Sequence, residues 1–279
     1  MRSSRARRSQ PSPLYNRFLL SESECDRIEV VLVSPRNPLN MGAVARAMAN
    51  FGFSRLAVVA PYADHWREAR SAVGAPELLA TAAEFGTLAE AVAGCTLVVG
   101  TGSLAYRKPE QPVIPLPNLP PLVQRELAHG GRVAMVFGGE KHGLTREDLS
   151  YCHLLVEIPT DARQPSMNLG QAVAVCLYEL ISGACPPERP STAAANTQAM
   201  DGLEEQSRAT NSGDLDLLAG LVEEVMLAAD YSPPAMREAN RHDLRVLLRR
   251  LALNRRDTRR ILGLFRRILW RLKSDKKAG

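Results

Sequence analysis

Short apolar runs alternate with helical patterns along the chain up to residue 184, and this alternation is the feature that most restricts its fold. Uninterrupted apolar runs of about five residues are typical of strands buried on both faces, as in parallel sheets. Helical patterns between such runs predict an α/β fold with a parallel sheet. The expected strands are Glu29–Val33, Arg55–Ala60, Thr96–Gly100, Val133–Phe137 and Leu154–Ile158.

Two helices are indicated beside these strands. Apolar residues at helical spacing between Met41 and Met48 predict a helix that begins near Asn40 and ends near Gly52. Asn168, followed three residues later by Gln171, is typical of a helix start and opens a second apolar helix.

The remainder of the chain has a different composition. Residues 185–213 contain no Phe, Trp or Tyr and are rich in Pro, Ser, Thr, Asn and Ala, which predicts a flexible linker. Helical patterns follow, with a break at the prolines of Ser232–Pro234. Their expected inward faces are Leu217, Leu218, Leu221, Val225 and Met226, then Leu244, Leu247, Leu248 and Leu251, then Ile261, Leu264, Phe265, Ile268 and Leu272. We expect a disordered basic tail (1–26), an α/β domain (27–184), this linker (185–213) and a basic helical extension (214–279).

Charge is divided unevenly between these segments. Residues 235–279 contain 15 Lys and Arg against 4 Asp and Glu, a net charge of +11, and residues 1–10 add four Arg without an acid. Residues 11–234 contain 16 bases and 26 acids, a net charge of −10. Attraction of a polyanion is therefore expected at the two ends of the chain.

The five cysteines are widely spaced and contain no Cys-x-x-Cys pair, so they indicate reduced thiols rather than disulfides or a zinc site. The sequence contains no apolar run long enough to span a bilayer. We therefore expect a cytoplasmic protein that binds neither a metal nor a membrane.

The segment Gly138–Thr145 follows an apolar strand and differs from a phosphate-binding P-loop at one decisive place. Leu144 stands where a P-loop has the Lys that reaches the phosphates, and its side chain has no donor for an anion. This argues against a nucleoside triphosphatase. The glycines still allow the backbone to approach a ligand closely at the end of a strand, where open α/β sheets bind ligands.

A second glycine turn, Gly100–Ala105, satisfies the pattern of a dinucleotide-binding fold. That fold needs a helix directly after the turn, but prolines follow at 109, 112, 115 and 117, so nicotinamide binding is not expected. The turn still offers backbone groups and hydroxyls to a ligand at a strand end.

Three blocks in a fixed order carry a family resemblance: Asn37–Arg46 after the first strand, Gly138–Thr145, and Ile158–Gln171 before a long apolar helix. Together they resemble the SPOUT class of RNA ribose 2'-O-methyltransferases, and within it the TrmJ-like branch of the TrmH family. The resemblance covers roughly residues 28 to 182.

The resemblance implies a C-terminal trefoil knot that holds the methyl donor S-adenosylmethionine (SAM), which is an exception to the usual absence of knots. It assigns donor binding to the turn after Gly100, to the loop 138–143 and to a third loop near 158–168. The implied SAM-binding residues are Thr101, Gly102, Ser103, Gly138, Glu140, Gly143, Ile158, Ser166, Met167 and Asn168. Plain core packing is the alternative for Leu144, Ile158 and Leu169, and a solvated acid for Glu140.

The resemblance makes Arg46 the catalytic residue. A guanidinium is effectively always protonated, so we expect it to stabilise the developing 2'-alkoxide rather than to act as a base. Asn40 is expected to fix this loop or to contact the donor's neighbourhood.

The implied partner is RNA, and tRNA methylated in the anticodon loop is the expected substrate. Ribosomal RNA is the alternative, and so is a non-catalytic RNA-binding protein that retains the fold. The resemblance also implies a homodimer. The expected RNA-binding residues are Asn40, Arg46, Arg249, Arg250, Arg255 and Arg256; merely solvated arginines on the helices are the alternative.

Overall fold

The computed structural model describes residues 20–102, 109–182, 208–231 and 233–278. The tail up to residue 19, Ser103 and the predicted linker up to residue 207 lie outside these ranges. Within them, no helix is both long and apolar enough to cross a membrane.

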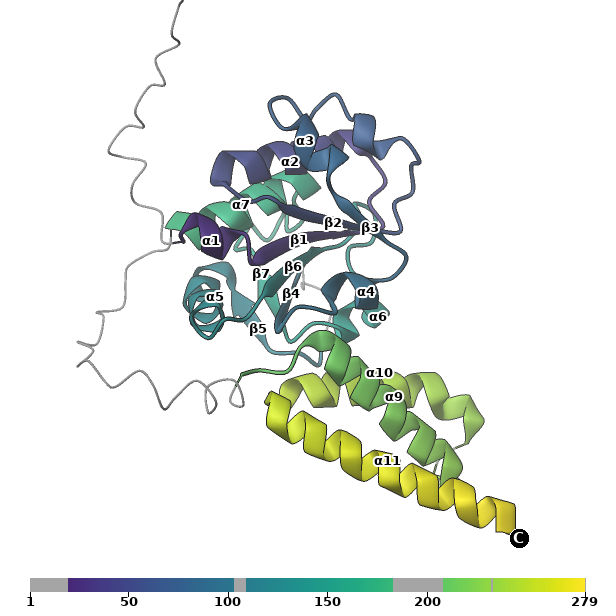
Figure 1. Cartoon of the computed structure of the whole chain (residues 1–279). Coiled ribbons are helices and arrows are strands. Elements are labelled where there is room, and N and C mark those ends of the chain that lie inside the picture. The colour runs from purple at the N-terminus through teal and green to yellow at the C-terminus, as the bar shows by residue number, and fades with distance from the viewer. Residues whose placement is uncertain (1–19, 103–108, 183–207, 232, 279) are drawn as a thin grey trace, which may run out of the picture.

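Seven parallel strands form one sheet in the order β3-β2-β1-β6-β4-β7-β5, which confirms the predicted α/β class (Figure 1). The strands are β1 Ile28–Val33, β2 Arg55–Val59, β3 Ala83–Phe85, β4 Leu97–Thr101, β5 Val113–Pro115, β6 Val133–Phe137 and β7 Leu154–Glu157. All five predicted strands are confirmed to within a residue at each end. β3 and β5 were not predicted because each has three residues on an edge of the sheet and no buried run.

Helices cover both faces of the sheet (Figure 1). One face packs against α1 Glu22–Cys25, α2 Pro38–Phe51, α3 Pro76–Ala80, α5 Leu119–Ala128 and α7 Leu169–Ser182, and the other against α4 Leu88–Val92 and α6 Arg146–Ser150. Short 3-10 turns at Trp66–Glu68 and Leu116–Asn118 complete this part. Successive residues of β1 alternate between the two apolar clusters, as the period of a strand requires.

Local signals set the ends of the two predicted helices. The Asn37 side chain accepts a hydrogen bond from the Leu39 backbone N–H, so α2 begins at Pro38, two residues before the predicted start. Gly52 ends α2 at φ 78°, a left-handed conformation that favours glycine. The Asn168 carboxamide oxygen accepts from the Gly170 N–H at 2.9 Å, as expected for the start of α7.

The helical extension consists of α9 Ser212–Ala228, a turn at Pro234–Met236, α10 Arg237–Arg250 and α11 Arg255–Ala278, with the predicted break at the prolines (Figure 1). Its core contains Leu215, Leu218, Ala219, Leu248 and Leu262. The predicted inward faces were too wide: Leu217, Leu247, Leu251 and Leu264 are exposed. Each helix of this small bundle buries one narrow stripe, and these leucines lie beside it.

Two predicted boundaries shift because flanking residues pack on the α/β core. Leu20 and Cys25, predicted in the tail, are buried, and Ser21 and Glu24 cap α1 reciprocally. At the predicted end of the linker, the Ser212 and Gly213 N–H groups donate to the carbonyls of Cys95 and Ala93. The extension therefore docks on the α4 and α6 side of the sheet.

Candidate active site

A cavity of about 250 Å³ opens at the carboxyl edge of the sheet. Its walls come from the segments that follow β4, β6 and β7, which are adjacent strands. The carboxyl ends of adjacent parallel strands meet at one edge, which is where open α/β sheets bind ligands. Eight of the predicted SAM-binding residues line it: Thr101, Gly102, Gly138, Glu140, Gly143, Ile158, Ser166 and Met167.

The loop after β6 is folded tightly on itself. Gly139 and Gly143 form an antiparallel bridge, and Gly143 adopts φ 63°. A Cβ atom on Gly138 would lie 2.1 Å from the Gly143 carbonyl carbon. The sequence predicted close approach of this backbone to a ligand, but the structure shows that Gly138 is needed first for close approach to its own loop.

Glu140 connects this loop to the start of α2. Its carboxylate accepts hydrogen bonds from the backbone N–H groups of Arg36 (2.9 Å) and Asn37 (3.0 Å) and from the Asn40 carboxamide (2.9 Å). Burial alone would raise the pKa of Glu140, but the bonds from Asn40 and the two backbone N–H groups lower it below its usual value. The carboxylate is therefore kept ionised, and it links the loop after β6 to the start of α2.

Asn168 extends the same network. Its amide nitrogen donates to the Asn40 side-chain oxygen at 2.9 Å, so Glu140, Asn40 and Asn168 form one chain of hydrogen bonds. The three sequence blocks are thus joined by side chains. Asn168 is not among the cavity-lining residues, and its position supports a role in holding α7 against α2 rather than in contacting a ligand.

Thr101 lines the cavity, but its hydroxyl is already used. The side chain is buried and donates to the Val136 carbonyl at 3.0 Å, which ties β4 to β6. A ligand in the cavity can therefore bind mainly the backbone groups of Thr101.

The apolar walls are those expected from the sequence: Leu144, Ile158, Met167 and Leu169 all line the cavity. Leu144 and Leu169 also belong to the buried core, so the two readings of these residues are compatible. The predicted site residues did not include Phe137, Lys141, His142, Thr160 and Pro165, which also line the cavity. Four of them lie inside the sequence blocks and Phe137 directly precedes one, so taking each block whole would have found nearly all of them.

Arg46 is exposed on α2 and does not line the cavity. Its helix is fixed at the cavity end by Asn37 and by the bond from Asn40 to Glu140. Neighbouring residues Ala45 and Ala47 are buried, so the backbone that carries Arg46 is held rigidly while the guanidinium faces outward.

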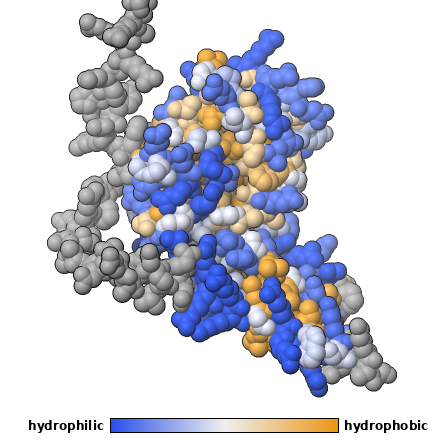
Figure 2. Space-filling view, in the orientation of Figure 1, coloured by the Kyte–Doolittle hydropathy of each residue, from blue (hydrophilic) through white to orange (hydrophobic). Residues whose placement is uncertain are grey.

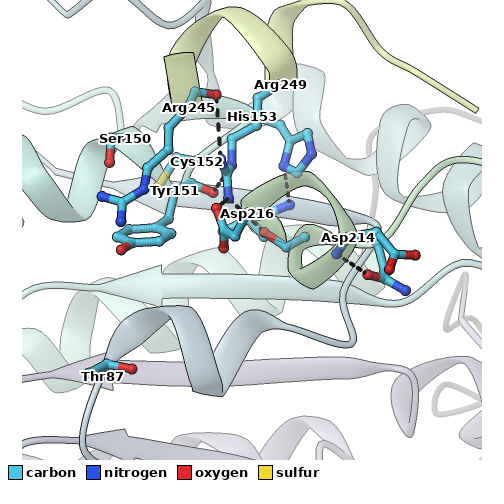
Figure 3. A network of polar contacts seen from close by, with 12 residues as sticks. Thr87, Ser150, Tyr151, Cys152, His153, Asp214, Asp216, Arg245 and Arg249 are labelled. Carbon is cyan, nitrogen blue, oxygen red and sulfur yellow. Dashed lines mark hydrogen bonds and ion pairs between the residues drawn. The ribbon is translucent and has the colours of Figure 1, made fainter. Parts of the chain in front are cut away.

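Arg249, predicted to bind RNA, is instead buried where the extension meets the α/β core (Figure 3). We call this contact region the junction. Its guanidinium donates to the Tyr151 carbonyl, the Ser212 hydroxyl and the Asp216 carboxylate, each at 2.9 Å. The side chain is 1% exposed. That prediction was wrong because the sequence shows charge but not the direction of a side chain on its helix.

The other predicted RNA-binding arginines differ in accessibility. Arg250 and Arg256 are exposed, and Arg255 is half-buried. Exposed arginines continue along α11 at 259, 260, 266 and 267. Figure 2 shows hydrophilic residues over much of the extension, with an apolar patch between them.

His153 lies at the same junction and is half-buried (Figure 3). Its Nδ1 accepts a hydrogen bond from the Val98 N–H at 3.1 Å, so the ring is neutral. Burial, and secondly the nearby Arg249 charge, lower the pKa of His153 to about 3.

We expect acidification to weaken the fold through His153. In the unfolded chain the ring titrates near its ordinary value of 6.5, whereas the folded value is about 3. Its contribution to stability is therefore complete above pH 6.5 and is lost as the pH falls towards 3, at about 1.4 kcal/mol per pH unit for one proton. Urea unfolding of the wild type and of His153→Asn between about pH 7 and about pH 5 measures this slope. An equal slope in the variant would assign the effect to other groups.

Glu110, His242 and Asp243 place one possible metal-ligand atom each within 4.8 Å of one another. Arg146 already contacts both carboxylates, at 3.1 Å from Glu110 and 3.9 Å from Asp243. The arginine therefore supplies the cation, and we assign no metal to this group.

The seven-stranded parallel sheet with helices on both faces is the fold of the SPOUT class of methyltransferases. Residues 27–178 match the model of the SpoU rRNA Methylase family. The chain belongs to this family.

Curated relatives agree with this assignment. A tRNA (cytidine/uridine/adenosine-2'-O-)-methyltransferase TrmJ of Pseudomonas aeruginosa is 42% identical over 161 residues, which is 56% of this chain and 60% of that protein. A tRNA (cytidine/uridine-2'-O-)-methyltransferase TrmJ of Cronobacter sakazakii is 32% identical over 256 residues, 89% of this chain and 97% of that protein. The second alignment extends well beyond the family model.

A solved structure is similar over nearly the same length. TrmJ from Z. mobilis ZM4 superposes with a TM-score of 0.72 at 26% sequence identity, covering 86% of this chain and 98% of that chain. A probable methyltransferase from Bordetella pertussis Tohama I superposes with a TM-score of 0.53 at 30% identity, covering 57% of this chain and 97% of that chain.

Proposed function

We propose that this chain is a SAM-dependent methyltransferase that modifies a ribose 2'-hydroxyl of a cytidine or uridine in the anticodon loop of tRNA. The observation that carries the proposal is the cavity at the sheet edge. Glu140 lines this cavity and is bonded to Asn40, which fixes α2, the helix that carries Arg46, beside it. The names of the relatives from Pseudomonas and Cronobacter support tRNA as the substrate and the 2'-oxygen as the acceptor.

The cavity residues fit SAM chemically. Leu144, Ile158, Met167 and Leu169 give apolar walls for an adenine ring, and the Gly138–Gly143 backbone offers amide and carbonyl groups that can bind its polar edge and the ribose. When bound, SAM supplies an electrophilic methyl group on a sulfonium.

Arg46 is the proposed catalytic residue. A positively charged guanidinium beside the target nucleotide would stabilise the negative charge that develops on the 2'-oxygen and would orient that oxygen for in-line attack. Its exposure leaves it free to reach RNA outside the cavity. Asn40 would act as a positioning residue, since both ends of its carboxamide are already bonded to Glu140 and Asn168.

We further propose the trefoil knot and a homodimer. The knot is supported by the match of residues 27–178 to the SpoU rRNA Methylase family. The dimer is supported by Val175 and Tyr178, which remain exposed on α7 at 36% and 56%. A site at a two-fold interface could combine Arg46 of one subunit with the donor cavity of the other. Light scattering measures the oligomeric state.

Calorimetric titration with SAM is the first test of the proposal, because the alternative, a non-catalytic RNA-binding protein, needs no methyl donor. Methyl transfer from SAM to tRNA and to ribosomal RNA transcripts then separates the two substrate classes. The absence of SAM binding at millimolar donor would leave only a non-catalytic RNA-binding protein.

Neutralising two exposed arginines of the extension is expected to weaken tRNA binding in a salt-dependent way. If Arg250 and Arg256 each neutralise one phosphate, the double Arg→Gln variant should flatten the slope of log affinity against log salt by roughly 1.4 to 1.8. Binding isotherms at several salt concentrations measure this slope. An unchanged slope would show that these side chains are only solvated.

A further inference from the structure

An exposed arginine and an exposed tyrosine are stacked on each other beside the cavity. The Arg36 guanidinium carbon lies 4.7 Å from the centroid of the Tyr62 ring. Tyr62 is 73% exposed, in a chain with only 5% aromatic residues. An isolated exposed cation–π contact adds about 0.5–1 kcal/mol, which is little reason to leave a large aromatic ring in water.

The backbone places this pair at the carboxyl edge of the sheet, the edge at which the cavity opens. Arg36 and Tyr62 follow β1 and β2, whose last residues Val33 and Val59 are paired in the sheet. Directly after those strands, Ser34 and Ala60 adopt φ 48° and φ 44°, a left-handed conformation that costs a residue other than glycine about 1–2 kcal/mol.

Backbone hydrogen bonds hold both turns in place. The Ser34 N–H donates to the Val59 carbonyl at 2.8 Å, and the Tyr62 N–H donates to the Pro35 carbonyl at 3.0 Å. The two turns therefore form one unit.

The unit is continuous with the candidate active site. The Arg36 N–H donates to the Glu140 carboxylate, and Glu140 lines the cavity. One residue thus separates the stacked pair from the proposed donor site. Leu39, three residues after Arg36, is 58% exposed, and its carbonyl accepts a hydrogen bond from the Ser71 hydroxyl.

The chemistry of this surface fits an unpaired nucleotide. A flat ring with one face in water can stack on a nucleobase, and the arginine on its other face can pair with the adjoining phosphate. An anticodon loop contains such unpaired nucleotides. We propose that Arg36 and Tyr62 form a stacking site for a substrate nucleotide that neighbours the methylated ribose. This inference rests on the proposed function and adds a substrate-binding site to it.

Steady-state kinetics with tRNA test the site. Tyr62→Leu keeps an apolar side chain but removes the stacking ring, and it should raise KM for tRNA about tenfold with kcat nearly unchanged. Tyr62→Phe is the matched control, since it keeps the ring, and its KM should stay within about twofold of the wild type. Calorimetry should show the same SAM affinity in all three proteins.

Two results would overturn the inference. An unchanged KM for Tyr62→Leu in an otherwise active enzyme would show that the ring touches no RNA. Loss of the dimer in Tyr62→Leu, seen by light scattering, would assign the surface to a second copy of the chain. A wild-type protein that transfers no methyl group would instead contradict the proposed function itself.

Discussion

Replacing Arg46 with alanine is expected to lower kcat for tRNA methylation by about 10²–10³-fold, the usual cost of removing one preorganised charge or donor from a developing oxyanion. The affinity for SAM should stay within a few-fold of the wild type, because Arg46 does not line the cavity. Single-turnover methylation with saturating tRNA, together with calorimetry for SAM, measures the two effects separately.

Arg46→Lys is the control for charge alone. It keeps the positive charge but loses the planar fork of the guanidinium, so an intermediate rate is expected. If Arg46→Ala reduced SAM binding as strongly as methyl transfer, the residue would belong to the donor site and the proposed role would be wrong.

Removing the Arg249 side chain should loosen the extension from the α/β core. Arg249→Ala breaks the bonds to Tyr151, Ser212 and Asp216 and leaves the Asp216 carboxylate, 20% exposed, without this cation. Breaking a buried pair on one side typically costs about 3–5 kcal/mol. We therefore expect the free energy needed to separate the extension from the α/β core to fall by that amount. Native-state hydrogen exchange of the α9 and α10 amides measures this free energy.

The adjacent residue provides a matched control. Arg250 carries the same charge on the same helix but is exposed, so Arg250→Ala should change the free energy of opening by less than about 0.5 kcal/mol. Equal effects of the two substitutions would contradict the distinction between a buried junction and a solvated face.

The sequence predicted the centre of the sheet because burial on both faces leaves a clear mark. β6 is apolar, β1 is apolar apart from Glu29, and both are buried along their lengths, so their limits could be predicted to within one residue. β3 and β5 are short and partly exposed at the edges, and nothing in their composition separates them from loops. Their place in the sheet is set by tertiary pairing with β2 and β7.

The candidate site was predicted in its location more fully than in its roles. The glycine spacing and the apolar residues placed the cavity on the correct loops, since these features depend on local backbone geometry. Asn40 is bonded to Glu140, 100 residues away in the chain, and to Asn168, 128 residues away. Local sequence patterns could not pair residues so far apart.

Side-chain direction was the other missing information. Arg249 and Arg250 are indistinguishable as letters, yet one is buried and the other exposed. The Arg36–Tyr62 contact likewise joins two loops on neighbouring strands and has no signal in either loop alone.

The most direct measurement for the central claim is nucleoside mass spectrometry of tRNA after incubation with the protein and methyl-labelled SAM. We predict labelled 2'-O-methylcytidine or 2'-O-methyluridine with the wild type, and loss of that product with Arg46→Ala. A label found on a base, or a tRNA that stays unlabelled although the protein binds SAM, would contradict the account.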